Sequence, residues 1–129
     1  MTAMCVIGSI LLVFCWIFSN SLMTKEVVDQ QRTNVITLII INTLLSCAGS
    51  GLVTFMIMSI KSMSEDSISS FKVYEPLELA NSLICGLVSI TASCNNVSFT
   101  SAFFIGVIGS ILYAVTVIIY ERNKIDDPI

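Results

Sequence analysis

The charged residues of this chain are confined to three short windows, and this arrangement constrains its fold more than any other feature. The 6 basic and 9 acidic residues all fall within residues 25–32, 61–78 and 121–127. A charge at the centre of a membrane span costs about 2.5 to 3.5 kcal/mol, so membrane proteins keep charges out of their spans. Only 12% of the residues are charged, against about 25% in soluble domains. The sequence therefore predicts an all-α, multi-pass integral membrane protein.

The charge-free tracts set the number of helices. A span needs about 20 residues to cross roughly 30 Å of hydrocarbon. The tract 81–120 is long enough to cross twice, and its polar cluster Ser93-Cys94-Asn95-Asn96 is the natural place for a tight turn. We therefore predict one membrane region over residues 1–129, with four transmembrane helices at about 3–24, 33–61, 77–94 and 99–120.

The first tract has a second interpretation, a secretory signal peptide, because its apolar run ends in the small polar residues Ser19-Asn20-Ser21. No basic residue precedes the run, however, and the run is longer than the usual apolar region of a signal peptide. Both features favour a membrane span.

The basic residues also predict an orientation. Four spans place Lys61, Lys72, Arg122 and Lys124 on the side of both termini, and Lys25 and Arg32 on the other side. The positive-inside rule then puts both termini on the cytoplasmic or equivalent inner side. A glycosylation sequon, Asn96-Val97-Ser98, would face outward, but we expect it to be unused because it lies so close to the membrane.

Several function classes find no support in the composition. Histidine is absent, which removes the usual imidazole base and zinc ligand. Glu78 follows Pro76 just inside a helix start, where the helix dipole favours an anion, and it has no partner carboxylate at matching depth. No basic patch could hold nucleic acid.

We expect no enzyme activity, no cofactor and no metal site. The cysteines show no metal spacing and are interpreted as small apolar residues: Cys5, Cys15, Cys47, Cys85 and Cys94.

Small residues recur every fourth position in two of the predicted spans. Thr43, Cys47 and Gly51 form one row, and Ala102, Gly106, Ser110 and Ala114 form another. Such rows let helices approach closely in lipid. We therefore expect Gly51, Ala102, Gly106 and Ser110 to lie in helix-packing faces.

Several short motifs follow one another along the chain in an order that is typical of one protein family. Asn81 to Ser98 reads NSLICGLVSITASCNNVS, and the tail 124–128 reads KIDDP. The first resembles a signature of the ammonium transporter/Rhesus family, and the second is similar to the family's K-V-D-D-P element. Residues 105–109, 42–43, 51–53 and 8–20 fit further family helices in the same order. The matching motif positions include Asn81, Gly86, Thr91, Cys94, Asp126, Asp127 and Pro128.

The resemblance implies a fold and a mechanism. The chain would correspond to helices six to nine of an eleven-helix fold, built from two inverted five-helix repeats and assembled as a trimer. Inverted repeats place the conduction path between the two halves. The implied activity is passage of ammonia along an apolar lumen, after ammonium loses a proton at an aromatic vestibule. The implied partners are the lipid bilayer and a complementary transporter half or other membrane subunits.

Residues for the pore also follow from the resemblance. The family's gating phenylalanine aligns with Ser19, next to Phe18, which makes Trp16, Phe18 and Ser19 the pore-lining candidates. The matching motif positions are helix-end and packing positions in the family, and we interpret them as structural.

The chain departs from the family at positions that matter for transport. The family's paired pore histidines have no counterpart in this sequence, Ala92 stands where the family has proline, and Asn95 stands where it has glycine. Two hypotheses follow. The chain is a subunit of an ammonium transport protein, or it is a non-transporting structural subunit of a larger membrane complex.

Overall fold

The computed structural model describes residues 2–22, 31–64 and 76–123. They form four α-helices: α1 (Thr2–Leu22), α2 (Gln31–Ser64), α3 (Pro76–Ile90) and α4 (Phe99–Arg122). No strand occurs within these described ranges. The predicted all-α architecture is confirmed, and each helix overlaps one of the charge-free tracts.

Local chemistry explains where α3 and α4 begin. Pro76 is the first residue of α3, the position where a missing N–H costs nothing, and Glu78 lies in its first turn. Ser98 precedes α4, and its side-chain oxygen accepts a hydrogen bond from the backbone N–H of Ser101 at 3.4 Å. A serine at this position satisfies one of the free donors of a helix N-terminus.

The link between α3 and α4 is a run of hydrogen-bonded turns over residues 91–96. The N–H of Ser93 donates to the carbonyl of Ile90, and that of Asn96 donates to the carbonyl of Ser93, both at 3.0 Å. The regular helix thus ends at Ile90, four residues before the predicted end of the span. The cluster of short polar side chains explains this, because Ser and Asn favour turns over helix interiors.

The helices differ in length. The 34 residues of α2 extend over roughly 50 Å, whereas the 15 residues of α3 reach only about 23 Å. Two stretches are long and apolar enough to cross a bilayer, Asn34–Ile60 and Phe99–Tyr120. Val6–Leu22 and Pro76–Ile90 are shorter apolar helices.

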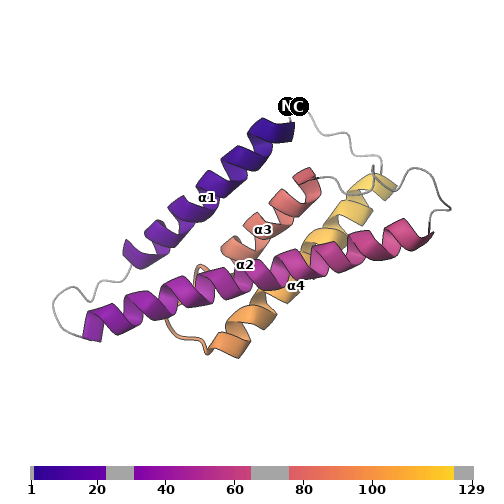
Figure 1. Cartoon of the computed structure of the whole chain (residues 1–129). Coiled ribbons are helices and arrows are strands. Elements are labelled where there is room, and N and C mark those ends of the chain that lie inside the picture. Colours follow the sequence, from indigo (N-terminus) through magenta and orange to yellow (C-terminus); the bar gives the residue numbers. More distant parts are fainter. Residues whose placement is uncertain (1, 23–30, 65–75, 124–129) are drawn as a thin grey trace.

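In Figure 1, α2 lies across both α3 and α4, and α1 lies on the side of α3. Three buried apolar residues of the core come from these helices, namely Ile39 from α2, Ile90 from α3 and Ala102 from α4. Outside this core, large apolar side chains cover the surface of all four helices, among them Leu11, Phe14, Phe18, Leu52, Phe104 and Ile118. Exposed apolar surface of this extent is typical of a protein surrounded by lipid or by other helices.

Candidate functional site

Four hydroxyl side chains meet in the buried centre between α2, α3 and α4, and we call them the hydroxyl cluster: Ser50, Thr54, Ser82 and Ser110. Ser50, Ser82 and Ser110 are 0% exposed and Thr54 is 6% exposed. The Oγ atoms of Ser82 and Ser110 lie 3.0 Å apart, and Thr54 Oγ1 lies 2.9 Å from Ser110 Oγ. Ser50 Oγ lies 2.9 Å from Ser82 Oγ and also donates to the Ser82 carbonyl. Thr54 donates to Ser82 as well. Ser82 thus bonds to the other three members.

Glycines allow the helices to come close enough for these bonds. A Cβ atom added to Gly106 would overlap the carbonyl oxygen of Ser46, and one added to Gly86 would lie 2.6 Å from Ser50 Cβ. Ser46 Oγ donates to the Gly86 carbonyl at 2.8 Å. Small residues that admit such contacts are the usual basis of helix association in membranes.

The hydroxyl cluster stabilises helix packing and supplies no catalytic group. Its members carry no charge and are neither strong acids nor strong bases, so they offer no general acid or base. Their mutual bonds satisfy polar groups that would otherwise be costly to bury in an apolar setting.

A second polar contact secures the turn between α3 and α4. Asn42 of α2 is completely buried, and its Nδ2 donates to the carbonyls of Cys94 and Val97 at 2.8 and 2.9 Å. The Oδ1 of Asn42 has no partner within the described residues. Cys94 is buried in the same place, and its Sγ lies 3.6 Å from the Thr91 carbonyl. Asn42 therefore fixes the end of α3 against α2.

The pore-lining candidates on α1 lie in different surroundings. The Nε1 of Trp16 donates to Thr91 Oγ1 at 2.8 Å, so Trp16 joins α1 to the turn after α3. Phe18 is 67% exposed, and Ser19 is exposed as well. Asn20, one residue further, is buried, and its Nδ2 donates to Thr43 Oγ1 at 3.4 Å. The structure therefore brings Trp16 into the fold and leaves Phe18 and Ser19 on its surface.

The predicted packing residues lie between the helices to different degrees. Ala102, Gly106 and Ser110 of α4 are all buried. Gly51 is half-buried, and a Cβ added there would lie 2.9 Å from Leu83 Cδ2. A neighbouring row of α2, also spaced by four, is buried throughout and runs through Asn42, Ser46, Ser50 and Thr54. Gly51 thus lies at the edge of the packed face, because the helix is turned by about 60° from the predicted row.

The motif positions of α3 and of the turn after it differ in burial. Gly86 is buried against α2, whereas Asn81 is exposed. Thr91 accepts the bond from Trp16 and donates to the Leu87 carbonyl at 2.9 Å. Asp126, Asp127 and Pro128 lie outside the described residues.

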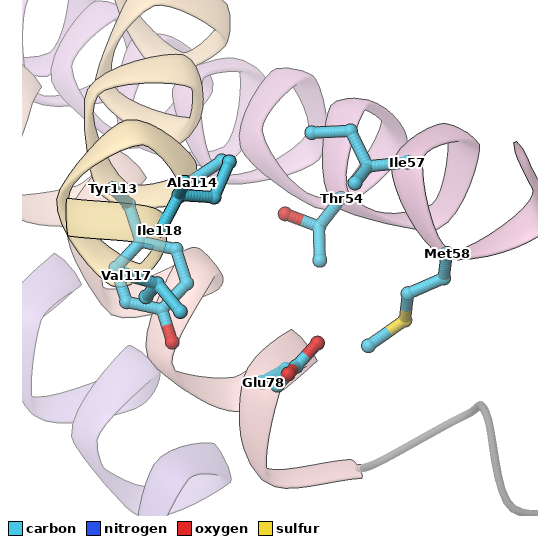
Figure 2. A pocket seen from close by; sticks show the side chains of 8 residues that line it. All are labelled: Thr54, Ile57, Met58, Glu78, Tyr113, Ala114, Val117 and Ile118. Atoms are coloured by element: carbon cyan, nitrogen blue, oxygen red, sulfur yellow. The ribbon is translucent and has the colours of Figure 1, made fainter. Parts of the chain in front are cut away.

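A small hollow of about 50 Å³ lies between α2, α3 and α4. Figure 2 shows the carboxylate of Glu78, the hydroxyl of Thr54 and the ring of Tyr113 around it. The other lining residues are Ile57, Met58, Ala114, Val117 and Ile118. Across the described ranges, no three His, Cys, Asp or Glu side chains gather to hold a metal ion. The polar groups that line the hollow are the carboxylate of Glu78 and the hydroxyl groups of Thr54 and Tyr113.

Sequence reasoning missed the hydroxyl cluster and the hollow. Ser46, Ser50 and Thr54 follow a four-residue spacing, as do the small residues next to them, so a signal for the cluster was present. The sequence predicted Glu78 at a helix start, where the helix dipole favours an anion, and without a partner carboxylate at matching depth. The nearness of Tyr113 depends on how α3 and α4 pack.

Comparisons with known proteins agree with one another. The family model described as Ammonium Transporter Family matches residues 1–129. A protein of Synechocystis sp. whose name assigns it to ammonium transport is 37% identical over 101 residues. That match covers 78% of this chain and 21% of the relative, so the chain spans about a fifth of the relative's length. No solved structure matches the chain.

Proposed function

The chain belongs to the ammonium transporter family, and from this premise we propose that it forms part of a membrane protein that carries ammonium or ammonia across a bilayer. The match to the family model over residues 1–129 carries this proposal. The helical fold and its apolar surface give independent support for a membrane setting.

We propose that all four helices cross the membrane in alternating directions. Trp16, near the end of α1, bonds to Thr91, just after the end of α3, so these two ends lie together. Asn42, in the first half of α2, bonds to the carbonyls of Cys94 and Val97 in the turn before α4. The four helices therefore share one end at the turn. The turns over 91–96 would extend the short α3 toward the outer surface, with both chain termini on the inner side.

Helix α1 is the part of the chain that we assign to the conduction path. Phe18 and Ser19 are the positions that the family resemblance relates to the pore, and both are exposed within the chain. An aromatic ring at this place can attract a cation through the negative face of its π system. We propose that Phe18 faces the path and that helices outside residues 1–129 supply the opposite wall, as expected for a path between two halves.

Uptake of methylammonium tests the proposal. The protein is purified in mild detergent together with the chains that accompany it, which mass spectrometry identifies, and the complex is reconstituted into liposomes. We expect uptake that requires this chain, and about a threefold loss with Phe18→Ala, since one cation–π contact is removed.

Phe104→Ala is the matched control, because Phe104 is 61% exposed and lies on α4. Its removal deletes a similar apolar surface and should leave uptake unchanged. A complex whose uptake is the same with and without this chain would contradict the proposal. That result would instead favour the alternative function, a structural subunit of a larger membrane complex.

A further inference from the structure

The hollow in Figure 2 contains a carboxylate that has no partner of opposite charge among the described residues. Glu78 is half-buried in the first turn of α3, and the side chains across the hollow include Met58 of α2 and Val117 of α4. Arg122 is exposed about one turn beyond Ile118, another lining residue, but it forms no ion pair with Glu78. A carboxylate beside apolar side chains is costly to ionise unless a cation accompanies it. The dipole of α3 offsets part of this cost but leaves the hollow itself without a cation.

The surface around the hollow is apolar and exposed. Ile118 lines the hollow and is 55% exposed, and Leu77, next to Glu78 in the sequence, is 44% exposed. Ionisable side chains in membrane helices face other helices or water-filled cavities, and they pair with groups there. At protein interfaces, arginine is one of the commonest anchors of desolvated pockets. The surroundings of Glu78 therefore suit a helix that brings a cation on an apolar face.

The position of the hollow along the helices indicates where that cation comes from. In the four-span arrangement proposed above, the bond between Trp16 and Thr91 lies at the outer end of α3. Glu78 is in the first turn of α3 and therefore lies toward the inner side. Segments at the inner ends of membrane helices carry an excess of arginine and lysine. A neighbouring helix is thus expected to carry its basic residues at the depth of Glu78.

We propose that the hollow is a docking site for the guanidinium group of an arginine, carried at the inner end of a neighbouring membrane helix outside residues 1–129. The carboxylate of Glu78 accepts two N–H groups of the guanidinium, and the hydroxyl oxygen of Thr54 accepts a third. The ring of Tyr113 lies against the guanidinium plane, and Met58 contacts the alkyl part of the arginine side chain. The exposed side chains around the hollow pack against the apolar face of the same helix. The docking site requires the membrane arrangement proposed above but not transport.

The chemistry and the size of the hollow favour guanidinium over other cations. A guanidinium group stays charged, is only weakly hydrated and binds a carboxylate through two parallel N–H bonds. It also stacks on aromatic rings such as that of Tyr113. A water-sized group needs roughly 10 to 15 Å³, so about 50 Å³ holds three or four such groups, close to the carbon and three nitrogens of guanidinium. Hard cations such as Mg²⁺ and Ca²⁺ prefer six or more oxygen ligands, which one carboxylate and two hydroxyl groups do not provide.

Photo-crosslinking in the membranes of cells that make the full protein identifies the helix that covers the hollow. Ile118→p-benzoylphenylalanine places the reactive group at the hollow, and mass spectrometry locates the crosslinked residue. We expect that residue to lie on a membrane helix outside residues 1–129, within about one turn of an arginine. Leu112→p-benzoylphenylalanine is the matched control, because Leu112 is 61% exposed on α4 and does not line the hollow. It should not crosslink next to that arginine.

Charge reversal then tests whether Glu78 holds this arginine. Glu78→Arg should lower the crosslinking yield at Ile118 about tenfold or more, because two guanidinium groups repel each other. Replacement of the neighbouring helix's arginine by glutamate in the same protein should restore most of the yield. Replacement of that arginine by lysine should lower the yield about threefold, because lysine lacks the planar fork. Glu65→Arg, just after α2 and on the same side in the proposed arrangement, is the charge-matched control and should leave the yield unchanged.

Glu78→Gln keeps the test decisive if the Glu78→Arg protein does not fold. It should lower the yield about fivefold, because a charge-assisted bond is lost. A Glu78→Gln protein that unfolds in SDS like the natural protein and crosslinks with unchanged yield would overturn the proposal. A crosslink to lipid alone, to a second copy of this chain or to a helix without an arginine near the crosslinked residue would overturn it as well, as would a reversed pair that restores no yield. None of these readouts involves uptake, so the docking site and the proposed transport function stand or fail separately.

Discussion

The unit formed by α2, α3 and α4 and the single helix α1 are held in place by different means. The three helices share the hydroxyl cluster and contacts at Gly86 and Gly106 that leave no space for a side chain. Among the described residues of α1 whose burial is known, only Asn20 is buried. Its interactions with the rest of the chain include two side-chain hydrogen bonds near one end, from Trp16 to the turn after α3 and from Asn20 to α2.

This difference shows how a membrane chain can separate stability from recognition. Close packing between backbones leaves no room for another partner between α2, α3 and α4. Helix α1 packs against α2 and α3 with half-buried residues, and it keeps large apolar side chains, including Phe14 and Phe18, exposed for contact with other helices. The following predictions test that contrast.

The largest effect is expected at the closest helix contact. Gly106→Val places a side chain against the Ser46 carbonyl, where a Cβ would already overlap, and should destabilise the fold by about 3 kcal/mol or prevent folding. Gly8→Val is the matched control, because a Cβ on Gly8 meets nothing within 4 Å, and it should change stability by less than about 0.5 kcal/mol. Unfolding by SDS in mixed micelles measures both. Equal losses would refute the contrast between the two regions.

A smaller effect is expected at the centre of the hydroxyl cluster. Ser82→Ala removes the shared partner of Ser50, Thr54 and Ser110, and should lower the free energy of unfolding by about 1 to 2 kcal/mol. Ser89→Ala on the same helix should cost almost nothing, because Ser89 is exposed and bonds to the Cys85 carbonyl of its own helix. The same SDS titration applies. A Ser82→Ala protein as stable as the Ser89→Ala protein would mean that glycine contacts alone hold the unit.

The smallest effect on stability is expected at the attachment of α1. Thr91→Val removes the acceptor of the Trp16 bond at nearly constant shape and should cost about 0.5 to 1 kcal/mol. Hydrogen exchange followed by mass spectrometry should become faster in α1 and stay unchanged in α2 and α4. Thr91→Ser keeps the hydroxyl group and should behave like the natural protein. Faster exchange throughout the chain would show that α1 is an integral part of the core.

The helices could be located from the sequence because each charged residue is, by itself, costly to bury in a membrane. The positions of the charges along the chain therefore mark where spans can and cannot lie. The lengths of the three charge-free tracts, together with the polar cluster from Ser93 to Asn96 that marks a turn in the third, indicated four helices. The family could be recognised from the sequence because its motifs, such as residues 81–98, are continuous stretches of the chain and do not depend on how the helices pack.

The phase of each helix and the contacts between helices could not be obtained in this way. α2 carries small residues in two neighbouring rows, Thr43 to Gly51 and Ser46 to Thr54, which lie about 60° apart around the helix. Composition gives no reason to choose between them. The choice depends on the hydroxyl groups of Ser82 and Ser110, which come from helices far along the chain. The hollow beside Glu78 depends on the same packing.

Asn42 links the order of synthesis to the order of membrane insertion. In the proposed four-span arrangement, α2 leaves the ribosome well before Cys94 and Val97, whose carbonyls receive the amide of Asn42. A polar group without a partner in hydrocarbon costs several kcal/mol. In that arrangement we expect a nascent chain that ends before residue 97 to hold α2 in a less stable state than the finished chain does, because the Asn42 amide still lacks these acceptors. Synthesis of the α3–α4 hairpin would supply them, so α2 would reach its final stability only after the turn has been made.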